Sequence, residues 1–291
     1  MKRAAFILMS ILAVPAWLGA QTPVDERRDA AADGVVEIEN LVGSVKVIGW
    51  GEAAVQVTGT LASGAELEFE ASGNRTHIEV EVDDDNPMEA ASDLEVHVPA
   101  GSHVEIEGVR LDVEVSGVTG SLEVETVEGG ITQSGAAKEV SLQSVMGTVE
   151  VTGSSGHIQA ETVNGSVTVR NSSGQVEAST VNGQLVVSDG SFDRVALESV
   201  AGAVSFEADL ASQARVDIET VSGSVELFVS PNIKAEFAIS SFSGGLENEL
   251  GIGTIEQESF LPAKELNFST GEGGARISVE TLSGSVHIRK R

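Results

Sequence analysis

The chain has no cysteine and no tyrosine, and only 6 prolines and 2 tryptophans among its 291 residues. The absence of cysteine excludes disulfides and a lipid on an N-terminal Cys, so packing and backbone pairing must supply stability. Trp50 is the only tryptophan beyond residue 20, so the flat aromatic platforms typical of sugar-binding surfaces are scarce. No segment repeats apolar residues every three to four positions, which excludes a mainly helical fold.

Basic residues are also scarce: 17 Lys and Arg stand against 45 Asp and Glu, giving a formal charge of −28. Loss of residues 1–20 would remove Lys2, Arg3 and no acid, so the charge would become −30. Such a polyanion is repelled by nucleic acid and by anionic lipid surfaces. We therefore expect no nucleic-acid partner.

The N-terminus carries the pattern of a secretory signal peptide over residues 1–20. Lys2 and Arg3 precede an apolar run that ends in small residues before Gln21. A retained membrane helix is the alternative, but Pro15 interrupts the run and a polar stretch follows it. No later apolar segment approaches the ~20 residues of a bilayer span. These features predict export without a transmembrane segment, to the periplasm, the outer surface or the medium.

The remaining sequence predicts an all-β protein. Apolar and polar residues alternate in segments such as 35–39, 94–98 and 122–125, which places apolar side chains on one face of each strand. We expect a polar linker at 21–33 and then an N-terminal β region at 34–115. This region is continuous with repeats at 116–291 that end in a capping strand. The acidic stretch Asp83, Asp84, Asp85 is interpreted as a loop within this structure.

An internal repeat organises the second half of the chain. An apolar residue stands two positions before a glycine, and the glycines recur mostly at intervals of 18 to 21 residues. The apolar column is Val127, Val145, Val163, Val181, Val200, Val221, Phe242 and Leu282, and the glycine column is Gly129, Gly147, Gly165, Gly183, Gly202, Gly223, Gly244 and Gly284. Stacked coils tolerate such variable intervals at their corners, so the repeat favours a β-solenoid, similar to a β-helix.

An antiparallel β-meander of hairpins is the alternative fold, because Asn-Gly between alternating residues is also a hairpin signal. In the solenoid interpretation each glycine is a corner with positive φ. The apolar column, with Val163 as its example, points inward, and the Thr and Ser column beside it lines the outside. The basic end of the chain, Arg289 to Arg291, would protect an exposed terminal edge from end-to-end self-association.

No catalytic constellation stands out, and no cofactor is expected. His97 and His103, followed by Glu105 and Glu107, have the residue types of a metal site but not a short ligand spacing, so we interpret them as solvent-facing. Asp83, Asp84 and Asp85 are only weak candidates for Ca²⁺, because the glycine and later glutamate of an EF-hand loop are missing.

Several segments together resemble the putative-adhesin family of exported bacterial β-repeat proteins, a domain of unknown function related to auto-transporter adhesin-like head domains. They are Gly43-Ser44-Val45-Lys46-Val47 with Trp50, Val98-Pro99-Ala100-Gly101, the Glu-Thr-Val-x-Gly units, and 271–277 before Ser283-Gly284-Ser285-Val286. The resemblance implies an envelope or surface protein with a solenoid-like fold and no established enzymatic activity.

Three functions are compatible with these observations. The first is a non-catalytic envelope or cell-surface scaffold, similar to an adhesin, that binds an unknown protein or a polymer of the envelope or matrix. The second is a polysaccharide-active β-helix lyase or hydrolase, which the scarcity of aromatic residues disfavours. The third is a sensory or regulatory module of envelope stress. Fold alone does not choose among them.

The signal-peptide interpretation predicts cleavage after Ala20. Intact-mass measurement of protein recovered from the cell envelope should give a chain that begins at Gln21. Mature protein that retains residues 1–20 would contradict this prediction.

Overall fold

The computed structural model describes residues 21–82, 88, 90–230, 232–257 and 262–291. The expected signal peptide and Asp83, Asp84 and Asp85 lie outside these residues. Strands make up the secondary structure and no α-helix occurs in the part described, so the all-β prediction is confirmed. Within the same residues there is accordingly no helix with the length and apolar character to cross a membrane.

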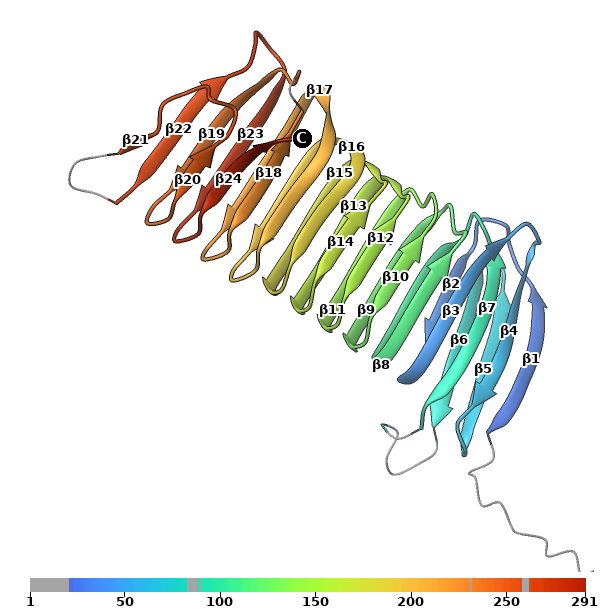
Figure 1. Ribbon diagram of the computed structural model, residues 1–291. Coiled ribbons are helices and arrows are strands. Elements are labelled where there is room, and N and C mark those ends of the chain that lie inside the picture. The colour runs from blue at the N-terminus through green and yellow to red at the C-terminus, as the bar shows by residue number, and fades with distance from the viewer. Residues whose placement is uncertain (1–20, 83–87, 89, 231, 258–261) are drawn as a thin grey trace, which may run out of the picture.

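The strands lie side by side along an elongated stack (Figure 1). They are β1 (Thr22–Asp29), β2 (Val35–Glu39), β3 (Val42–Trp50), β4 (Ala54–Leu61), β5 (Ala65–Ser72), β6 (Arg75–Val82), β7 (Ser92–Pro99), β8 (His103–Ser116), β9 (Ser121–Glu128), β10 (Ile131–Ser134), β11 (Glu139–Met146), β12 (Val149–Thr152), β13 (Ser155–Asn164), β14 (Val167–Arg170), β15 (Ser173–Asn182), β16 (Leu185–Ser199), β17 (Val204–Thr220), β18 (Val225–Val229), β19 (Ala235–Ser241), β20 (Leu246–Asn248), β21 (Glu256–Gln257), β22 (Lys264–Ser269), β23 (Ala275–Thr281) and β24 (Val286–Lys290).

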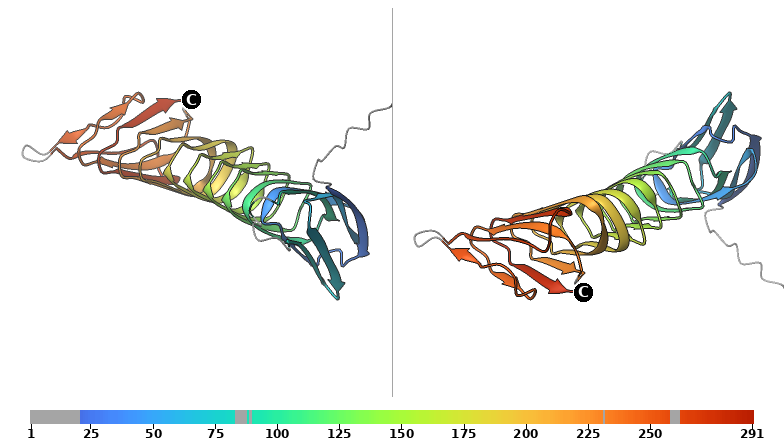
Figure 2. Two further views of the ribbon diagram at one scale, coloured as in Figure 1. Left: turned by 90° about the horizontal axis from the view of Figure 1, so that it is seen from below. Right: turned by 90° about the horizontal axis from the view of Figure 1, so that it is seen from above.

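The strands form two layers that face each other along the stack (Figure 2). The first layer has the order β5, β6, β2, β8, β9, β11, β13, β15, β16, β17, β23, β19, β22, β21. The second has the order β1, β4, β7, β3, β8, β10, β12, β14, β16, β17, β18, β24, β20. Strands β8, β16 and β17 take part in both layers.

Pairing from β2 and β3 through to β23 and β24 is parallel, and antiparallel pairs occur toward the two ends. Parallel pairing of successive coils is the arrangement of a solenoid and not of a meander of hairpins, in which neighbours are antiparallel. The fold is therefore solenoid-like.

The core lies between the layers and consists of apolar columns. Val140 pairs with Ile158 and Ile158 with Val176, and all three are fully buried. In the second layer Val149 pairs with Val167 in the same way. Because pairing is parallel and in register, each buried side chain packs on its equivalent one coil away. Burial of one such side chain contributes about 1.5 to 3 kcal/mol.

The inward assignment of the apolar column is wrong. The side chains of Val127, Val145, Val163, Val181, Val200, Val221, Phe242 and Leu282 are all exposed, whereas Thr126, Ser144, Thr162, Thr180, Ser199, Thr220, Ser241 and Thr281 beside them are buried. Alternation along β13 runs through Ile158, Ala160 and Thr162, which point inward, so Val163 points outward. The turn before Val167 then changes the inward positions from even to odd residue numbers.

The buried hydroxyls hydrogen-bond to the turns. Thr162 Oγ1 donates to the Gly147 carbonyl and Thr180 Oγ1 to the Gly165 carbonyl, each over 3.1 Å. In two longer coils the partner is the glycine three residues later, since Ser199 Oγ donates to the Gly202 carbonyl and Thr220 Oγ1 to the Gly223 carbonyl. A buried carbonyl without a partner is unfavourable, so this column requires a small hydroxyl residue.

The glycine column is explained by close approach of the backbone more than by positive φ. Gly129 and Gly183 have φ of 136° and 155°, but Gly165 lies outside the left-handed region. A Cβ on Gly165 would overlap the carbonyl oxygen of Gly147 on the preceding coil. The same conflict with the neighbouring coil recurs at the other glycines of the column.

The N-terminal linker expected at 21–33 is instead largely the strand β1. It pairs antiparallel with β4 over its whole length, from Thr22 opposite Leu61 to Asp29 opposite Ala54. Arg27 and Arg28 fix it further, because their guanidinium groups lie 5.1 and 5.0 Å from the ring centroids of Trp50 and Phe69. The polar composition of the segment hid this strand from the sequence analysis.

The capping role expected for the last strand is also wrong. β24 lies between β18 and β20, and β23 lies between β17 and β19, so the chain returns into the stack and does not end it. Arg289 pairs with Glu226 over 2.9 Å and Arg291 with Asp209 over 2.8 Å. The basic tail therefore holds neighbouring strands together and does not cover a terminal edge.

Substitution of a glycine in the glycine column should carry a steric cost that substitution of Gly51 does not. Gly165→Ala should lower the free energy of unfolding by about 1 to 3 kcal/mol, because the coils must separate to admit a methyl group. Gly51→Ala is the control, since a Cβ at Gly51 meets nothing within 4 Å. Urea unfolding of both variants measures the difference, and equal stabilities would contradict the close-approach explanation.

The corrected alternation predicts that substitutions of two valines of one coil change stability by different amounts. Val163→Ser should change stability by less than about 0.5 kcal/mol, because this side chain is exposed. Val167→Ser should cost at least about 2 kcal/mol, because it places a hydroxyl in the core. Thermal unfolding distinguishes the two, and a large loss for Val163→Ser would restore the inward assignment.

Candidate functional site

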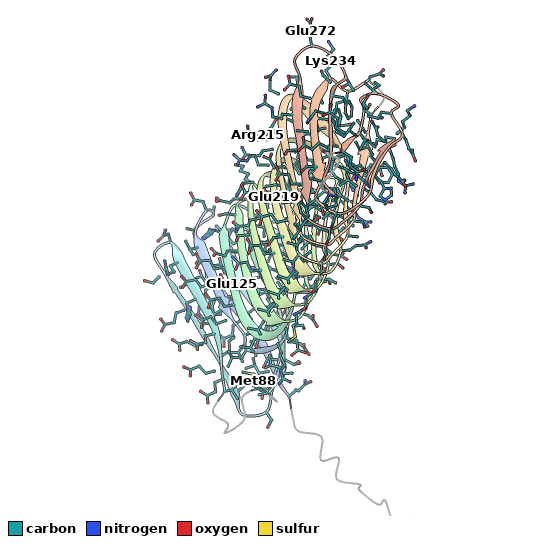
Figure 3. All side chains as sticks on the ribbon, turned by 90° about the vertical axis from the view of Figure 1, so that its left-hand side faces the viewer. Met88, Glu125, Arg215, Glu219, Lys234 and Glu272 are labelled. Carbon is teal, nitrogen blue, oxygen red and sulfur yellow. The ribbon has the colours of Figure 1, made fainter. Side chains whose placement is uncertain are left out.

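A groove runs along the outer surface of the first layer, across β2, β8, β9, β11, β13, β15, β16 and β17. It has a volume of about 780 Å³ and lies between two ladders of side chains. The valine ladder comprises Leu41, Val109, Val127, Val145, Val163, Val181, Val200 and Val221, and the acid ladder comprises Glu39, Glu107, Glu125, Gln143, Glu161, Ser179, Glu198 and Glu219. Glu125 and Glu219 mark the acid ladder in Figure 3.

Strand alternation produces both ladders at once. In β13, Glu161 and Val163 point outward and flank Thr162, which points into the core. Parallel pairing in register repeats this arrangement, so Glu161 lies beside Gln143 on one neighbouring strand and beside Ser179 on the other. Successive strands are about 4.8 Å apart, and the groove therefore extends for about 34 Å.

The valine ladder is an apolar strip on an acidic surface. Val109 is half-buried, and the exposed fractions of the other members range from 37% at Val181 to 45% at Val221. Single exposed apolar residues are ordinary, but a contiguous strip along a soluble surface is characteristic of a contact site. A smaller hollow of about 410 Å³ continues it past Phe242 and Leu282.

The acid ladder places like charges in register. Glu39 pairs with Glu107 and Glu107 with Glu125, and Glu198 pairs with Glu219. Like charges directly opposite each other on neighbouring strands are destabilising. Within the described part of the chain no ion pair reaches these carboxylates, and the ion pairs of Lys and Arg that occur there involve other acids. The charge of the ladder is thus left for solvent cations or for a partner.

The two histidines weighed as metal ligands lie in different layers. His97 is on β7 of the second layer and packs on Trp50, with ring centroids 5.1 Å apart. His103 is on β8 of the first layer, where Nε2 lies 2.8 Å from Glu105 and Nδ1 lies 2.5 Å from the hydroxyl of Ser121.

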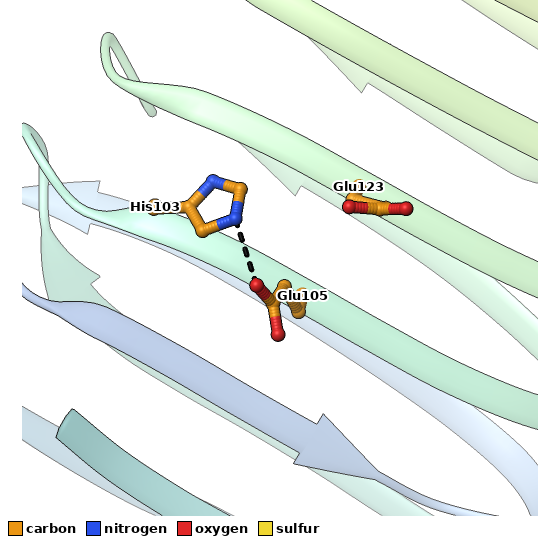
Figure 4. A group of neighbouring side chains, drawn as sticks. All are labelled: His103, Glu105 and Glu123. Atoms are coloured by element: carbon orange, nitrogen blue, oxygen red, sulfur yellow. Dashed lines mark ion pairs between the residues drawn. The ribbon is translucent and has the colours of Figure 1, made fainter.

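The structure adds Glu123 to His103 and Glu105 (Figure 4). Their ligand atoms lie within 4.8 Å of one another, on the adjacent strands β8 and β9. Three ligands on an open strand surface leave the remaining coordination to water, and both nitrogens of His103 already have partners. A second group, Glu68, Glu79 and Glu81, has only carboxylates near the N-terminal end of the stack.

Sequence analysis missed a ladder of arginines on the same layer. Arg194 pairs with Arg215 and Arg215 with Arg276, so three guanidinium groups occupy successive strands. Arg276 lies 3.2 Å from Glu236, and Arg215 lies 3.9 Å from Asp217. Unequal spacings in the sequence concealed this alignment, because the coils here contain different numbers of residues.

Several solved structures are similar to this chain over most of its length. A protein described as a putative adhesin from Bacteroides fragilis is 10% identical, with a TM-score of 0.44, over 93% of this chain and 98% of its own. For a putative adhesin from Parabacteroides distasonis the values are 8%, 0.39, 93% and 98%. For a putative lipid binding protein from the same species they are 10%, 0.35, 92% and 96%. These likenesses are too distant to carry a functional argument.

One family of proteins matches nearly the whole described chain. No curated protein matches this sequence. The model of the family described as Toastrack DUF4097 matches residues 32–289, which include the groove and most of both layers but not β1. This match confirms the resemblance predicted from the sequence. The chain belongs to the Toastrack DUF4097 family.

Proposed function

We propose that this protein is a non-catalytic, exported scaffold of the cell envelope or surface, and that its groove binds an extended partner. The observation that carries this proposal is the continuity of the groove across eight neighbouring strands, from β2 to β17. Each coil contributes an aliphatic side chain on one side and a polar or acidic side chain on the other. A site that is nearly uniform along its length suits repeated contacts with a linear molecule.

The groove also bears on the enzymatic alternative. Catalysis needs different groups converging on one bond, with a base, an acid or a nucleophile in hydrogen-bond reach of one another. The groove lining is instead valine, threonine, serine and glutamate repeated from coil to coil, and no aromatic side chain lines it. These features support a binding surface more than a polysaccharide lyase or hydrolase.

An exported location agrees with the signal-peptide pattern at residues 1–20. The repulsion between like charges along the acid ladder gives the partner a preferred sign. A scaffold of this kind binds through a large, rigid surface that is already formed, so binding costs little conformational entropy.

Site-specific photocrosslinking tests this proposal. A benzophenone amino acid replaces Val127, Val145 or Val163 in the groove, and Thr132 on the outer surface of the second layer as the control. After illumination with an envelope preparation from the source cells, the three groove positions should give the same crosslinked species. Thr132 should not.

Crosslinks of equal yield at Thr132 would show that contact is unspecific. Absence of crosslinks at all three groove positions would remove the groove as the binding surface. Either result would overturn the proposed function.

A further inference from the structure

The middle of the acid ladder has a regular spacing that indicates a class of partner. From Glu125 to Glu198 the glutamates occur on every second strand, at Glu125, Glu161 and Glu198, because Gln143 and Ser179 occupy the strands between them. Toward the two ends of the groove the row of carboxylates is continuous, since Glu107 lies beside Glu125 and Glu219 lies beside Glu198. Two strand spacings, or about 9.6 Å, therefore separate Glu125 from Glu161 and Glu161 from Glu198.

A polyproline II helix repeats at nearly the same distance. It has three residues per turn and rises about 3.1 Å per residue, so every third side chain recurs on one face after about 9.3 Å. Twelve residues of this helix span about 37 Å, close to the length of the acid ladder. In a fully extended strand, every second residue recurs after about 6.7 Å, which fits neither one strand spacing nor two.

The width of the groove also favours a slender chain. The two ladders stand two residues apart on each strand, a separation of about 6.6 Å along the backbone. An α-helix with its side chains is about 10 to 12 Å across and would rest on the ridges without entering. A polyproline II chain has no internal hydrogen bonds, so it can enter such a groove without losing any.

Charge and apolar character identify the side chains of the partner. Lysine or arginine at every third position would place a cation against each of Glu125, Glu161 and Glu198. The aliphatic stems of these residues could then cover the exposed faces of Val127, Val145 and Val163. A second copy of this chain is disfavoured as the occupant, because facing valine ladders would bring two acid ladders together.

From this geometry we propose that the groove binds a cationic polyproline II segment of a partner protein, with a basic residue at every third position. This inference rests on the proposed function, because it names the partner of the same groove. It goes further by fixing the conformation, the charge and the spacing of that partner. The aromatic platforms that would favour a cationic polysaccharide are not part of the groove lining.

The test uses the mature chain and a fluorescent peptide of four Lys-Pro-Pro repeats, with binding followed by fluorescence anisotropy. Three further peptides keep the number of charges and change one property each. Four Lys-Gly-Gly repeats remove the polyproline II preference, four Lys-Pro repeats change the spacing, and four Glu-Pro-Pro repeats reverse the charge. We expect the Lys-Pro-Pro peptide to bind most tightly and the Glu-Pro-Pro peptide not to bind.

Matched variants of the protein separate the groove from its overall charge. Glu125→Gln with Glu161→Gln removes two carboxylates that lie two strands apart on the acid ladder. Glu114→Gln with Glu150→Gln removes two exposed carboxylates at the same separation on the second layer, where Thr132 lies between them. The groove pair should weaken binding roughly tenfold and the control pair should leave it nearly unchanged.

The valine ladder is tested separately by Val127→Ser with Val145→Ser. These side chains are exposed, so the variant should fold normally and bind the peptide several-fold more weakly. Circular dichroism and thermal unfolding establish that every variant is folded before its binding is compared. Unchanged binding would show that the valine ladder does not contact the peptide and would contradict the proposed pose.

Other outcomes also overturn the inference. Equal losses for the groove pair and the control pair would mean that the peptide responds only to net charge. Equal binding of the Lys-Gly-Gly peptide would remove the polyproline II requirement, and equal binding of the Lys-Pro peptide would remove the spacing. Tighter binding of a partly deacetylated chitin oligomer would assign the groove to a saccharide.

Failure of every lysine peptide to bind the unaltered chain would reject this inference by itself. The photocrosslinking experiment would then decide the proposed function independently. Crosslinks at the groove positions would support a groove partner whose chemistry differs from the one inferred. Their absence would reject both the proposed function and this inference.

Discussion

Parallel pairing of successive coils in register is the constraint on which the rest of the structure depends. Each coil hydrogen-bonds to the next through its backbone, so equivalent residues lie about 4.8 Å apart whatever their chemistry. Apolar columns such as Val140, Ile158 and Val176 gain from this arrangement because they stack in the core. Like charges are not stabilised by stacking in register, yet Glu198 and Glu219 are held side by side. The pairing thus creates a core and an electrostatic cost together.

The sequence predicted the kind of fold well, because alternation and repeats are local patterns. It failed at the turn between β13 and β14, where the inward-facing positions change from even to odd residue numbers. Alternation back from Val167 and Val169 makes Val163 an inward residue, whereas alternation forward from Ile158 makes it an outward one. Hydrophobicity favoured the wrong choice, since it does not register that a buried Thr162 hydroxyl can bond to the turn of the neighbouring coil. The groove was missed for the same reason, because an inward valine column leaves no apolar strip on the surface.

The ends of the stack were harder to predict because they depend on contacts between residues distant in sequence. The chain returns so that β23 and β24 enter between coils formed earlier, and no local pattern marks such an insertion. At the N-terminal end the antiparallel strand β1 follows β4, and its charged residues Asp25, Glu26, Arg27 and Arg28 discourage pairing with another molecule. Antiparallel strands at the two ends interrupt the parallel register, which opposes indefinite stacking of further coils.

The stability of the fold does not explain the valine ladder. Outward positions of a strand favour β-branched residues, but threonine has this property too and occupies exposed or half-buried positions such as Thr132 and Thr168 in the second layer. An exposed apolar strip lowers solubility, and the neighbouring acid ladder offsets that effect through its charge. The chain therefore combines an exposed apolar strip and a row of negative charges over one long groove. A partner that satisfied only one of the two ladders would leave either valines exposed to water or carboxylates without counterions, so selectivity depends on meeting both.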